Sequence, residues 1–351
     1  MHEVVDLFCG VGGLSYGFAK EGFSVKTGVD TDPTCRFAFE QNTSGRFISE
    51  DIRSLSKNRI RKLFPRHRDV SKVLVGCAPC QPFSIYTGRY KKETHVHADK
   101  WALLEDFLHV AVITKPHVIS MENVPRLLKY PIFEGFVEAL EEMGYEVTYE
   151  VVRAHDYGVP QKRSRLVLFA SKFGPIDILA PTHLGKQKTV RDAIGKLAPI
   201  KAGECSDVDP LHRSRGLSKV NLRRIRSTSE GGGWKDWDKR LQLKCHAKEN
   251  GRSFRSVYGR MRWDAPSPVI TTQCLGIGNG RFGHPEQDRA ISIREAALLQ
   301  TFPKTYKFVK PGAEIYGLIL ARQIGNAVPV RLAKIIARSI RRHLQLEGRV
   351  N

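Results

Sequence analysis

The stretch Glu3-Val-Val-Asp-Leu-Phe-Cys-Gly-Val-Gly-Gly13 decides the fold of this chain. Residues 3–8 form a short apolar run that is typical of a buried strand, and a helical pattern begins at Gly13. Glycines between a strand and a helix let the backbone approach a nucleotide-like ligand closely. Asp30 follows about twenty residues after Gly10, where a carboxylate can bind ribose hydroxyls. The pattern predicts a nucleoside pocket but does not distinguish NAD from S-adenosylmethionine.

Strand-like and helix-like segments alternate through the first 175 residues. Strands joined by helices run parallel in one sheet, with the helices on its faces. The chain is therefore predicted to begin with an α/β domain on a doubly wound, Rossmann-like sheet. After strand 3–8 and helix 13–21, we expect strands at 24–29, 73–75 and 117–121, helices at 33–41, 102–114 and 133–143, and a hairpin of 145–152 with 165–170.

The sequence changes character after Pro181. Residues 183–257 are polar and basic and carry no pattern long enough to indicate a helix or a strand. Helical patterns return at 292–300 and 330–346. We expect an inserted smaller domain that is mostly β or irregular. The predicted division is 1–180 for the first domain, 181–297 for the inserted one, 298–319 for a hinge, and 320–351 for a piece that returns to the first domain.

The chain of 351 residues is strongly basic, with a formal net charge of +21 and a pI near 9.8. More than half of that excess lies in residues 182–265. Such a surplus is typical of a nucleic-acid-binding protein, although solubility or an acidic protein partner would also account for it. The sequence has no apolar stretch long enough for a transmembrane helix and no signal-peptide pattern, and its seven cysteines favour a reducing compartment. We expect a cytoplasmic, nucleoid-associated protein that does not bind membranes.

A thiol follows a strand-like run in Gly76-Cys-Ala-Pro-Cys-Gln-Pro-Phe-Ser84. The run at 72–75 precedes it, and prolines restrict the backbone on both sides of Cys80. Ligands of open α/β sheets bind at the carboxyl ends of the strands, where this segment is expected to lie. Position alone leaves Cys80 open between a nucleophile and a structural thiol.

Two charged patterns accompany this thiol. Met121-Glu-Asn-Val-Pro125 presents Glu122 at another strand end, and Gln161-Lys-Arg-Ser-Arg165 gives two arginines of the same parity, which face one side of an extended segment. Each has an ordinary explanation, as a solvated carboxylate or as a surface charge pair. Together the groups fit a thiol that attacks an electron-poor pyrimidine ring while the carboxyl and guanidinium groups bind ring atoms.

In this order the motifs resemble those of the DNA (cytosine-5) methyltransferases of the bacterial or phage restriction-modification type. The resemblance covers nearly the whole chain except about 185–257, and Cys77-Ala78 stands where the family usually has Gly or Pro. The segment 294–303 also matches the family. The motifs are Asp6-Leu-Phe-Cys-Gly-Val-Gly-Gly13, Pro79-Cys-Gln81, Glu122-Asn-Val124, Gln161-Lys-Arg-Ser-Arg165 and Gln323-Ile-Gly-Asn-Ala-Val-Pro329.

The resemblance implies methyl transfer from S-adenosylmethionine to carbon 5 of cytosine, with S-adenosylhomocysteine as the product and no metal. It makes Cys80 the nucleophile that adds to carbon 6, Glu122 the group at N3, and Arg163 with Arg165 the pair that orients the site and holds O2. It does not identify the base that removes the carbon 5 proton. The implied cofactor-binding residues are Phe8, Gly10, Gly12, Gly13, Leu14, Asp30, Thr31, Asp51, Ile52, Pro79, Leu103, Asn326, Ala327 and Val328.

A cytosine inside a duplex is out of reach of these groups, so the resemblance implies base flipping. Residues 84–100 are expected to form a loop that closes over the DNA, and residues 185–257 with the loop 276–283 to carry base specificity. The implied partner is double-stranded DNA. A cognate restriction endonuclease would act on the same site without a stable complex, and the enzyme would be a monomer. The DNA-binding candidates are Ser84, Arg89 and, as a reader of guanine, Arg281.

Four alternatives stay open from the sequence. A tRNA-type RNA (cytosine-5) methyltransferase shares the catalytic motifs but would have a small or absent insert. A NAD-dependent dehydrogenase shares the glycine loop but gives Cys80 and Glu122 no role. A redox or zinc protein would use Cys77 with Cys80, although no second Cys or His pair at metal spacing accompanies them. The fourth is an inactive DNA-binding protein. The recognised DNA sequence is not predicted.

Overall fold

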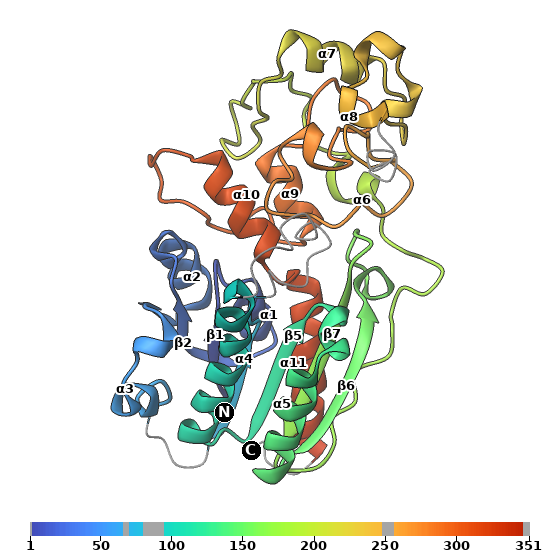
Figure 1. Cartoon of the computed structure of the whole chain (residues 1–351). Helices are drawn as coiled ribbons and strands as arrows, with labels where there is room; N and C mark the ends of the chain where they lie inside the picture. The colour runs from blue at the N-terminus through green and yellow to red at the C-terminus, as the bar shows by residue number, and fades with distance from the viewer. Residues whose placement is uncertain (1, 66–69, 80–94, 248–255, 347–351) are drawn as a thin grey trace. The chain divides into compact units, whose positions relative to one another are not determined.

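The computed structural model describes four stretches of the chain, residues 2–65, 70–79, 95–247 and 256–346 (Figure 1). Side-chain positions are described for all of these residues except 95–102. The chain divides into two compact units. Unit 1 contains residues 1–153, 164–181 and 328–351, and unit 2 contains residues 154–163 and 182–327.

Unit 1 is built on a seven-stranded sheet with the order β3-β2-β1-β4-β5-β7-β6. The first five strands pair in parallel, whereas β7 runs antiparallel to both β5 and β6. The direction in which the strand order grows reverses between β1 and β4, which is where such sheets bind ligands. The strands are His2–Leu7 (β1), Ser24–Asp30 (β2), Arg46–Ser49 (β3), Ser71–Gly76 (β4), Val118–Asn123 (β5), Glu146–Arg153 (β6) and Ser164–Ser171 (β7).

Helices cover both faces of this sheet (Figure 1). Helices α3, α4 and α5 lie on one face and α1, α2 and α11 on the other. The doubly wound α/β fold and the terminal hairpin predicted from the sequence are therefore confirmed. The helices are Gly13–Lys20 (α1), Arg36–Thr43 (α2), Lys57–Arg61 (α3), His95–Thr114 (α4), Pro131–Glu142 (α5) and Val330–Leu346 (α11).

The central strands form where the sequence is continuously apolar. Val5, Leu7 and Leu74 are completely buried, as are Phe107 of α4 and Leu140 of α5, all in one core cluster. A parallel sheet covered on both faces needs such runs, because neither side of the strand meets water. Each buried methylene contributes about 0.8 kcal/mol, so these runs specify the core strongly.

Three local features differ from the sequence expectation. Strand β3 and helix α3 are not predicted from the sequence. Strand β3 has only four residues, and Phe47 alone among them is buried. Helix α4 begins at His95, so residues 95–100, which are expected in a loop, are helical. The apolar patterns in these places are too short to predict an element.

The C-terminal helix α11 packs against α1. The helices approach so closely at Gly17 that a Cβ there would lie 2.4 Å from the Cβ of Ala333. Glu21, which is 5 % exposed at the end of α1, lies within ion-pair distance of three basic side chains of α11. These are Lys334 at 3.3 Å, Arg338 at 2.8 Å and Arg341 at 3.5 Å. These contacts join residues 330–346 to unit 1.

Unit 2 has short helices and much irregular backbone. In its described residues β pairing is limited to isolated bridges, so the expected irregular character is present and extended strands are not. Helix α10 packs against α9, and the Gln300 amide donates to the carbonyl oxygens of Ile324 and Ala327. These contacts place residues 298–327 in unit 2. The predicted division instead made 298–319 a hinge and assigned 320–327 to the piece that returns to the first domain. The helices are Val190–Ile194 (α6), Lys219–Arg226 (α7), Lys244–Ala247 (α8), Ile293–Leu299 (α9) and Gly317–Asn326 (α10).

In the described part of the chain, no helix is long and apolar enough to span a bilayer.

Candidate active site

The glycine-rich turn after β1 leads directly into α1. Phe8, Gly10 and Gly12 all have positive φ, at 59°, 50° and 85°. Glycine adopts this left-handed region without strain, and a Cβ at Gly10 would meet no atom within 4 Å. The turn thus leaves open space beside its backbone, at the carboxyl end of β1 and the N-terminus of α1. This is the space that a nucleoside would need.

Asp30 holds this turn in place. At the end of β2, its Oδ2 accepts a hydrogen bond from Gly10 N at 2.8 Å and its Oδ1 accepts one from Asp32 N at 2.9 Å. Burial raises the pKa of Asp30, and the two amide donors oppose that effect. The neighbouring Asp6 is buried too, which raises its pKa to about 7 although Ser15 Oγ donates to it at 2.6 Å. Asp30, the residue predicted to bind the ribose, therefore also stabilises the glycine-rich turn.

Three of the predicted cofactor-binding residues belong to one apolar cluster. Ile52 is buried in the main core, and Phe8 and Leu103 are partly buried against it. Asp51 lies beside Ile52 at the start of a short 3-10 turn, where Arg53 binds its carboxylate at 2.6 Å. Hydrogen bonding to Arg53 lowers the pKa of Asp51. An apolar wall with a charged rim is consistent with a site for a flat, polar-edged base.

The other predicted cofactor residues fall in several places. Leu14 is buried in α1, Thr31 is exposed after Asp30, and Pro79 is exposed near the end of a described stretch. Asn326 and Ala327 end α10 in unit 2, whereas Val328 begins the last segment of unit 1.

Glu122 forms the centre of a polar cluster at the carboxyl ends of β4 and β5. Its side chain is 2 % exposed, and Arg165 Nε of β7 lies 2.8 Å from its Oε1. On the other side, Cys77 Sγ donates to Oε2 at 2.8 Å. The explanation of Glu122 as a solvated strand-end carboxylate is therefore wrong. The sequence motifs identified Glu122 and Arg165 but gave Cys77 no role. The only sequence feature that singles out Cys77 is that it stands where the family usually has Gly or Pro.

The two arginines of the 161–165 segment are separated by the structure. Arg165 contacts Glu122 within unit 1, whereas Arg163 belongs to unit 2 and donates to Gln161 Oε1 at 3.4 Å. Arg163 is 3 % exposed, so it is not an ordinary surface charge. Cys80, Ser84 and Arg89 lie outside the described residues.

The guanidinium group of Arg281 is already hydrogen-bonded within unit 2. Its Nη1 donates to the carbonyl oxygens of Gly231, Gly232 and Arg260, the last two at 2.6 and 3.2 Å. Burial and the charge of Arg262 lower the pKa of Arg281. Because unit 2 has no sheet in its described part, buried guanidinium groups satisfy many of its loop carbonyls. This environment disfavours the expected contact of Arg281 with guanine.

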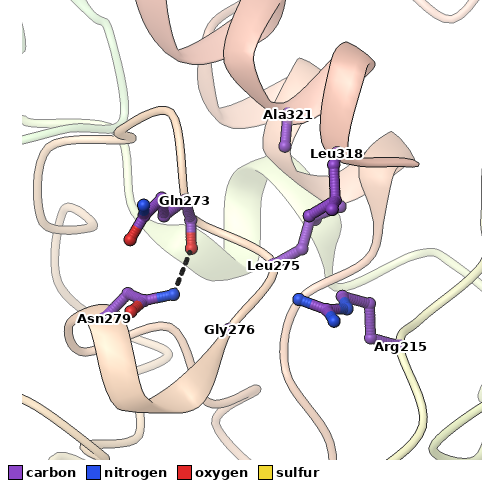
Figure 2. Close-up of a pocket in the computed structure, with 7 residues that line it drawn as sticks. All are labelled: Arg215, Gln273, Leu275, Gly276, Asn279, Leu318 and Ala321. Atoms are coloured by element: carbon purple, nitrogen blue, oxygen red, sulfur yellow. Dashed lines mark hydrogen bonds between the residues drawn. The ribbon is translucent and has the colours of Figure 1, made fainter. Parts of the chain in front are cut away.

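A separate polar pocket lies on unit 2 (Figure 2). The cavity has a volume of about 180 Å³, and apolar groups of Leu275 and α10 line part of it. Three exposed side chains capable of reading bases surround it, and Asn279 Nδ2 donates to the Gln273 carbonyl at 3.4 Å. These side chains are Arg215, Gln273 and Asn279.

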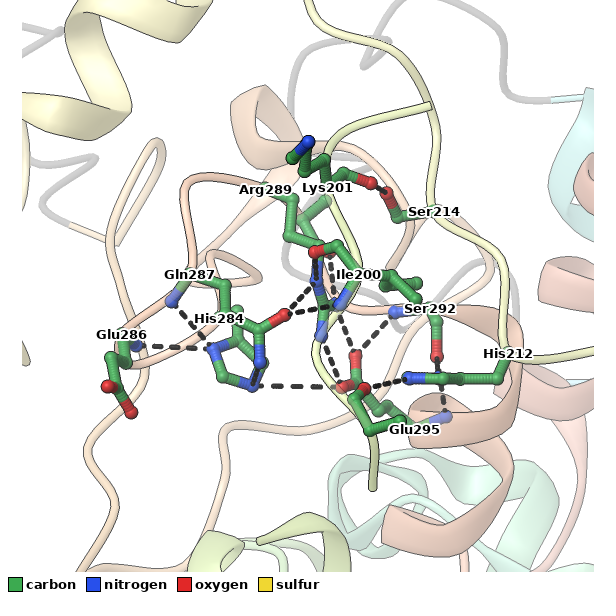
Figure 3. A network of polar contacts seen from close by, with 12 residues as sticks. Ile200, Lys201, His212, Ser214, His284, Glu286, Gln287, Arg289, Ser292 and Glu295 are labelled. Carbon is green, nitrogen blue, oxygen red and sulfur yellow. Dashed lines mark hydrogen bonds and ion pairs between the residues drawn. The ribbon is translucent and has the colours of Figure 1, made fainter. Parts of the chain in front are cut away.

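A buried charged network supports the same unit (Figure 3). Arg289 and Glu295, each side chain 1 % exposed, form two parallel contacts of 2.7 Å. Burial raises the pKa of Glu295, but hydrogen bonds and charge from Arg289 outweigh it and hold that pKa below its usual value. Burial disfavours the charged form of the adjacent His284 and so lowers the pKa of that imidazole to about 4. Sequence reasoning assigned no such pair, because charge partners within a polar region cannot be matched without the fold.

No group of three or more His, Cys, Asp or Glu side chains in the described residues could hold a metal ion.

Comparison with known proteins agrees with the site. Residues 2–342 match the family described as C-5 cytosine-specific DNA methylase. The Type II methylase M.HgiDII of Herpetosiphon aurantiacus is 50% identical over 97% of this chain and 96% of its own length. The Type II methyltransferase M1.HphI of Haemophilus parahaemolyticus is 32% identical over 96% of this chain and 86% of its own length.

The fold is also similar to a solved structure from E. coli, described as a DNA modification methyltransferase encoded within a prophage. It has a TM-score of 0.71 at 23% identity and covers 98% of this chain and 100% of that one. The glycine turn with its acidic partner, the buried Glu122 cluster and the family match agree with one another. The chain belongs to the C-5 cytosine-specific DNA methylase family and is a DNA cytosine-5 methyltransferase.

Proposed function

We propose that this enzyme transfers a methyl group from S-adenosylmethionine to carbon 5 of a cytosine flipped out of a specific duplex DNA site. Covalent addition of Cys80 at carbon 6 would activate the ring. The observation that carries the proposal is the buried Glu122 carboxyl group, which Arg165 holds at 2.8 Å at the carboxyl edge of the sheet. Residues 77–79, which follow β4 on the same edge, lead directly to Cys80.

The chemistry needs a nucleophile because carbon 5 of cytosine attacks a methyl donor poorly. The Cys80 thiolate forms a bond to carbon 6, and the electron pair of the ring double bond moves toward carbon 5. If protonated, Glu122 can donate a hydrogen bond to N3 and stabilise the charge that develops there, while Arg163 and Arg165 orient the site and hold O2. After carbon 5 takes the methyl group, a base removes its proton and the carbon–sulfur bond breaks, which regenerates the thiolate.

The glycine turn and its neighbours fit S-adenosylmethionine. This compound carries a methyl group on positively charged sulfur, which makes it an electrophile. Gly10 leaves room for it, Asp30 would bind the ribose hydroxyls, and Phe8 with Ile52 would contact the adenine. Asp30 would act in two ways, because it also fixes the turn through Gly10 N.

Replacing Asp30 with alanine is expected to weaken S-adenosylmethionine binding by about 10- to 100-fold, the size expected when hydrogen bonds to a charged group are removed. Asp30→Asn should weaken binding less, because its amide oxygen can still accept from Gly10 N. Titration calorimetry measures both effects. Asp177→Ala, at an exposed carboxylate of unit 1, is the matched control. Equal affinity of Asp30→Ala and wild type would contradict the assignment of Asp30.

We further propose that unit 2 reads the DNA sequence through the pocket formed by Arg215, Gln273 and Asn279. Arginine pairs with guanine through two hydrogen bonds, and glutamine or asparagine pairs with adenine in the same way. Arg215 and Asn279 lie in the segments expected to carry specificity, and Gln273 lies just before the second of them. This pocket replaces Arg281, whose Nη1 already binds loop carbonyls.

Gln273→Ala is expected to reduce discrimination at one base pair by about 1–3 kcal/mol while leaving the salt dependence of DNA binding unchanged. Lys219→Ala, at an exposed lysine of α7, is the contrasting variant. If Lys219 binds a DNA phosphate, this variant should lower the salt slope of binding by about one without changing base preference. Methylation of a randomised DNA pool, followed by bisulfite sequencing, gives the preference. An unchanged site for Gln273→Ala would exclude it from base reading.

A restriction-modification setting is supported by the Type II names of the two relatives. In that setting the enzyme would protect the sites of a cognate endonuclease without forming a stable complex with it. It would act as a monomer in the cytoplasm, on the nucleoid.

One assay tests the reaction itself. Labelled methyl groups from S-adenosylmethionine should appear on carbon 5 of cytosine in duplex DNA and not in tRNA. Label in tRNA alone would identify an RNA substrate instead. No label in either nucleic acid, with a protein that still binds duplex DNA, would identify an inactive DNA-binding protein.

A further inference from the structure

The thiol of Cys77 occupies a defined place beside Glu122. Cys77 follows β4 immediately, and its Sγ donates to Glu122 Oε2 at 2.8 Å. The opposite oxygen, Oε1, lies 2.8 Å from Arg165 Nε. The carboxyl group thus accepts one hydrogen bond, from the group that follows β4, and forms an ion pair with a guanidinium group of β7. Contacts on both sides restrict its rotation.

A second hydrogen bond between the same two segments lies one residue further along the chain. Gly76 pairs with Met121 at the end of the β4–β5 ladder. Beyond it, Cys77 bonds to Glu122 and the Ala78 carbonyl accepts from Asn123 Nδ2 at 3.4 Å. Side chains therefore extend the register of the two strands into the segment that precedes Cys80. The contacts couple the position of the carboxyl group to the position of this segment.

The bland explanation is that Cys77 only fills space. A packing thiol normally lies among apolar groups, but Cys77 is partly exposed and its nearest described polar partner is a buried carboxylate. A nucleophilic role for Cys77 is disfavoured as well, because its thiol proton is engaged in the hydrogen bond to Glu122. The contact with Glu122 is what distinguishes this thiol.

We propose that Cys77 is a positioning residue that fixes the Glu122 carboxyl group for its contact with the cytosine ring. The thiol donor holds Oε2 so that the carboxyl plane keeps one orientation as the base enters the site. The inference rests on the proposed role of Glu122 in binding N3. A side chain at position 77 without a donor leaves Oε2 without this contact.

Cys77→Ala and Cys77→Ser form the test. Alanine removes the donor, and kcat should fall by about 10-fold or more, as expected when one hydrogen bond to a charged group is removed. The KM for S-adenosylmethionine should not change. The pH profile of kcat/KM should differ from that of wild type, because the Glu122 carboxyl group has lost the donor at Oε2. Serine keeps a donor, so it should restore kcat to within about threefold of wild type and return the profile.

Two controls separate this proposal from others. Cys205→Ala removes an exposed thiol of unit 2 and should leave kcat and the profile unchanged. Thermal melting of each variant reports any general loss of stability. Wild-type kcat and pH profile in Cys77→Ala would overturn the positioning role, and so would equal losses in the alanine and serine variants. Glu122→Gln is measured beside them. If it too is fully active, the proposed function of Glu122 has failed; if it is inactive, only the role of Cys77 has.

Discussion

Replacing Cys80 with serine will abolish methyl transfer, by at least about 10³-fold, while S-adenosylmethionine binding stays near wild type. A serine hydroxyl ionises far less readily than a thiol, so it supplies almost no nucleophile at neutral pH. The glycine turn after β1 and its partner Asp30 at the end of β2 are held together by a hydrogen bond that does not involve position 80. Transfer of labelled methyl groups to duplex DNA measures the loss, and calorimetry with S-adenosylmethionine measures the binding.

The companion measurement traps the intermediate. Duplex DNA with 5-fluorocytosine at the target position should form an adduct that survives a denaturing gel, because fluorine cannot leave as a proton. Cys77→Ser should still form this adduct, and Cys80→Ser should not. A Cys80→Ser enzyme with a tenth or more of wild-type turnover is incompatible with covalent catalysis by Cys80. Adduct formation that depends on Cys77 would reassign the nucleophile.

Glu295→Gln will destabilise unit 2 by about 3–5 kcal/mol, the cost of leaving one partner of a buried ion pair without the other. The substitution keeps the size of the side chain but removes the charge that balances Arg289, and both side chains are 1 % exposed. Urea unfolding followed by tryptophan fluorescence measures this change. Three of the four tryptophans, Trp234, Trp237 and Trp263, lie in unit 2, so the signal reports mainly on that unit.

Asp264→Asn is the matched control for this change. Asp264 pairs with Arg191 at 2.7 Å in the same unit, but both side chains are more than half exposed. Exposed pairs contribute little because water already solvates both charges. Its unfolding midpoint should therefore stay near wild type. If Glu295→Gln and Asp264→Asn unfold at the same urea concentration, the buried pair contributes no more to the stability of unit 2 than the exposed pair.

The sequence predicts the catalytic half of the structure well, for a simple physical reason. Strands such as β1 and β4 are buried on both faces and must be continuously apolar, and the turn after β1 needs glycine at positive φ. Asp30 is the last residue of β2 and Glu122 the next to last of β5, so their place at the edge of the sheet follows from the same pattern.

Unit 2 is predicted poorly because its order comes from long-range polar contacts. Arg260 is 4 % exposed and donates to the carbonyls of Ile225 and Thr228 at the end of α7 and to that of His284, far along the chain. No local periodicity announces such bonds, and a basic residue in a basic region looks like a DNA contact. The expectation that Arg281 reads guanine has the same origin.

The close approach of α1 and α11 at Gly17 has a consequence for how the protein is made. The face of α1 that receives Ala333 stays uncovered on the ribosome until nearly the whole chain has been translated. At about 5–20 residues per second, synthesis of residues 182–327 of unit 2 delays this step by roughly 7–30 s. The first domain to begin synthesis is thus the last to be completed.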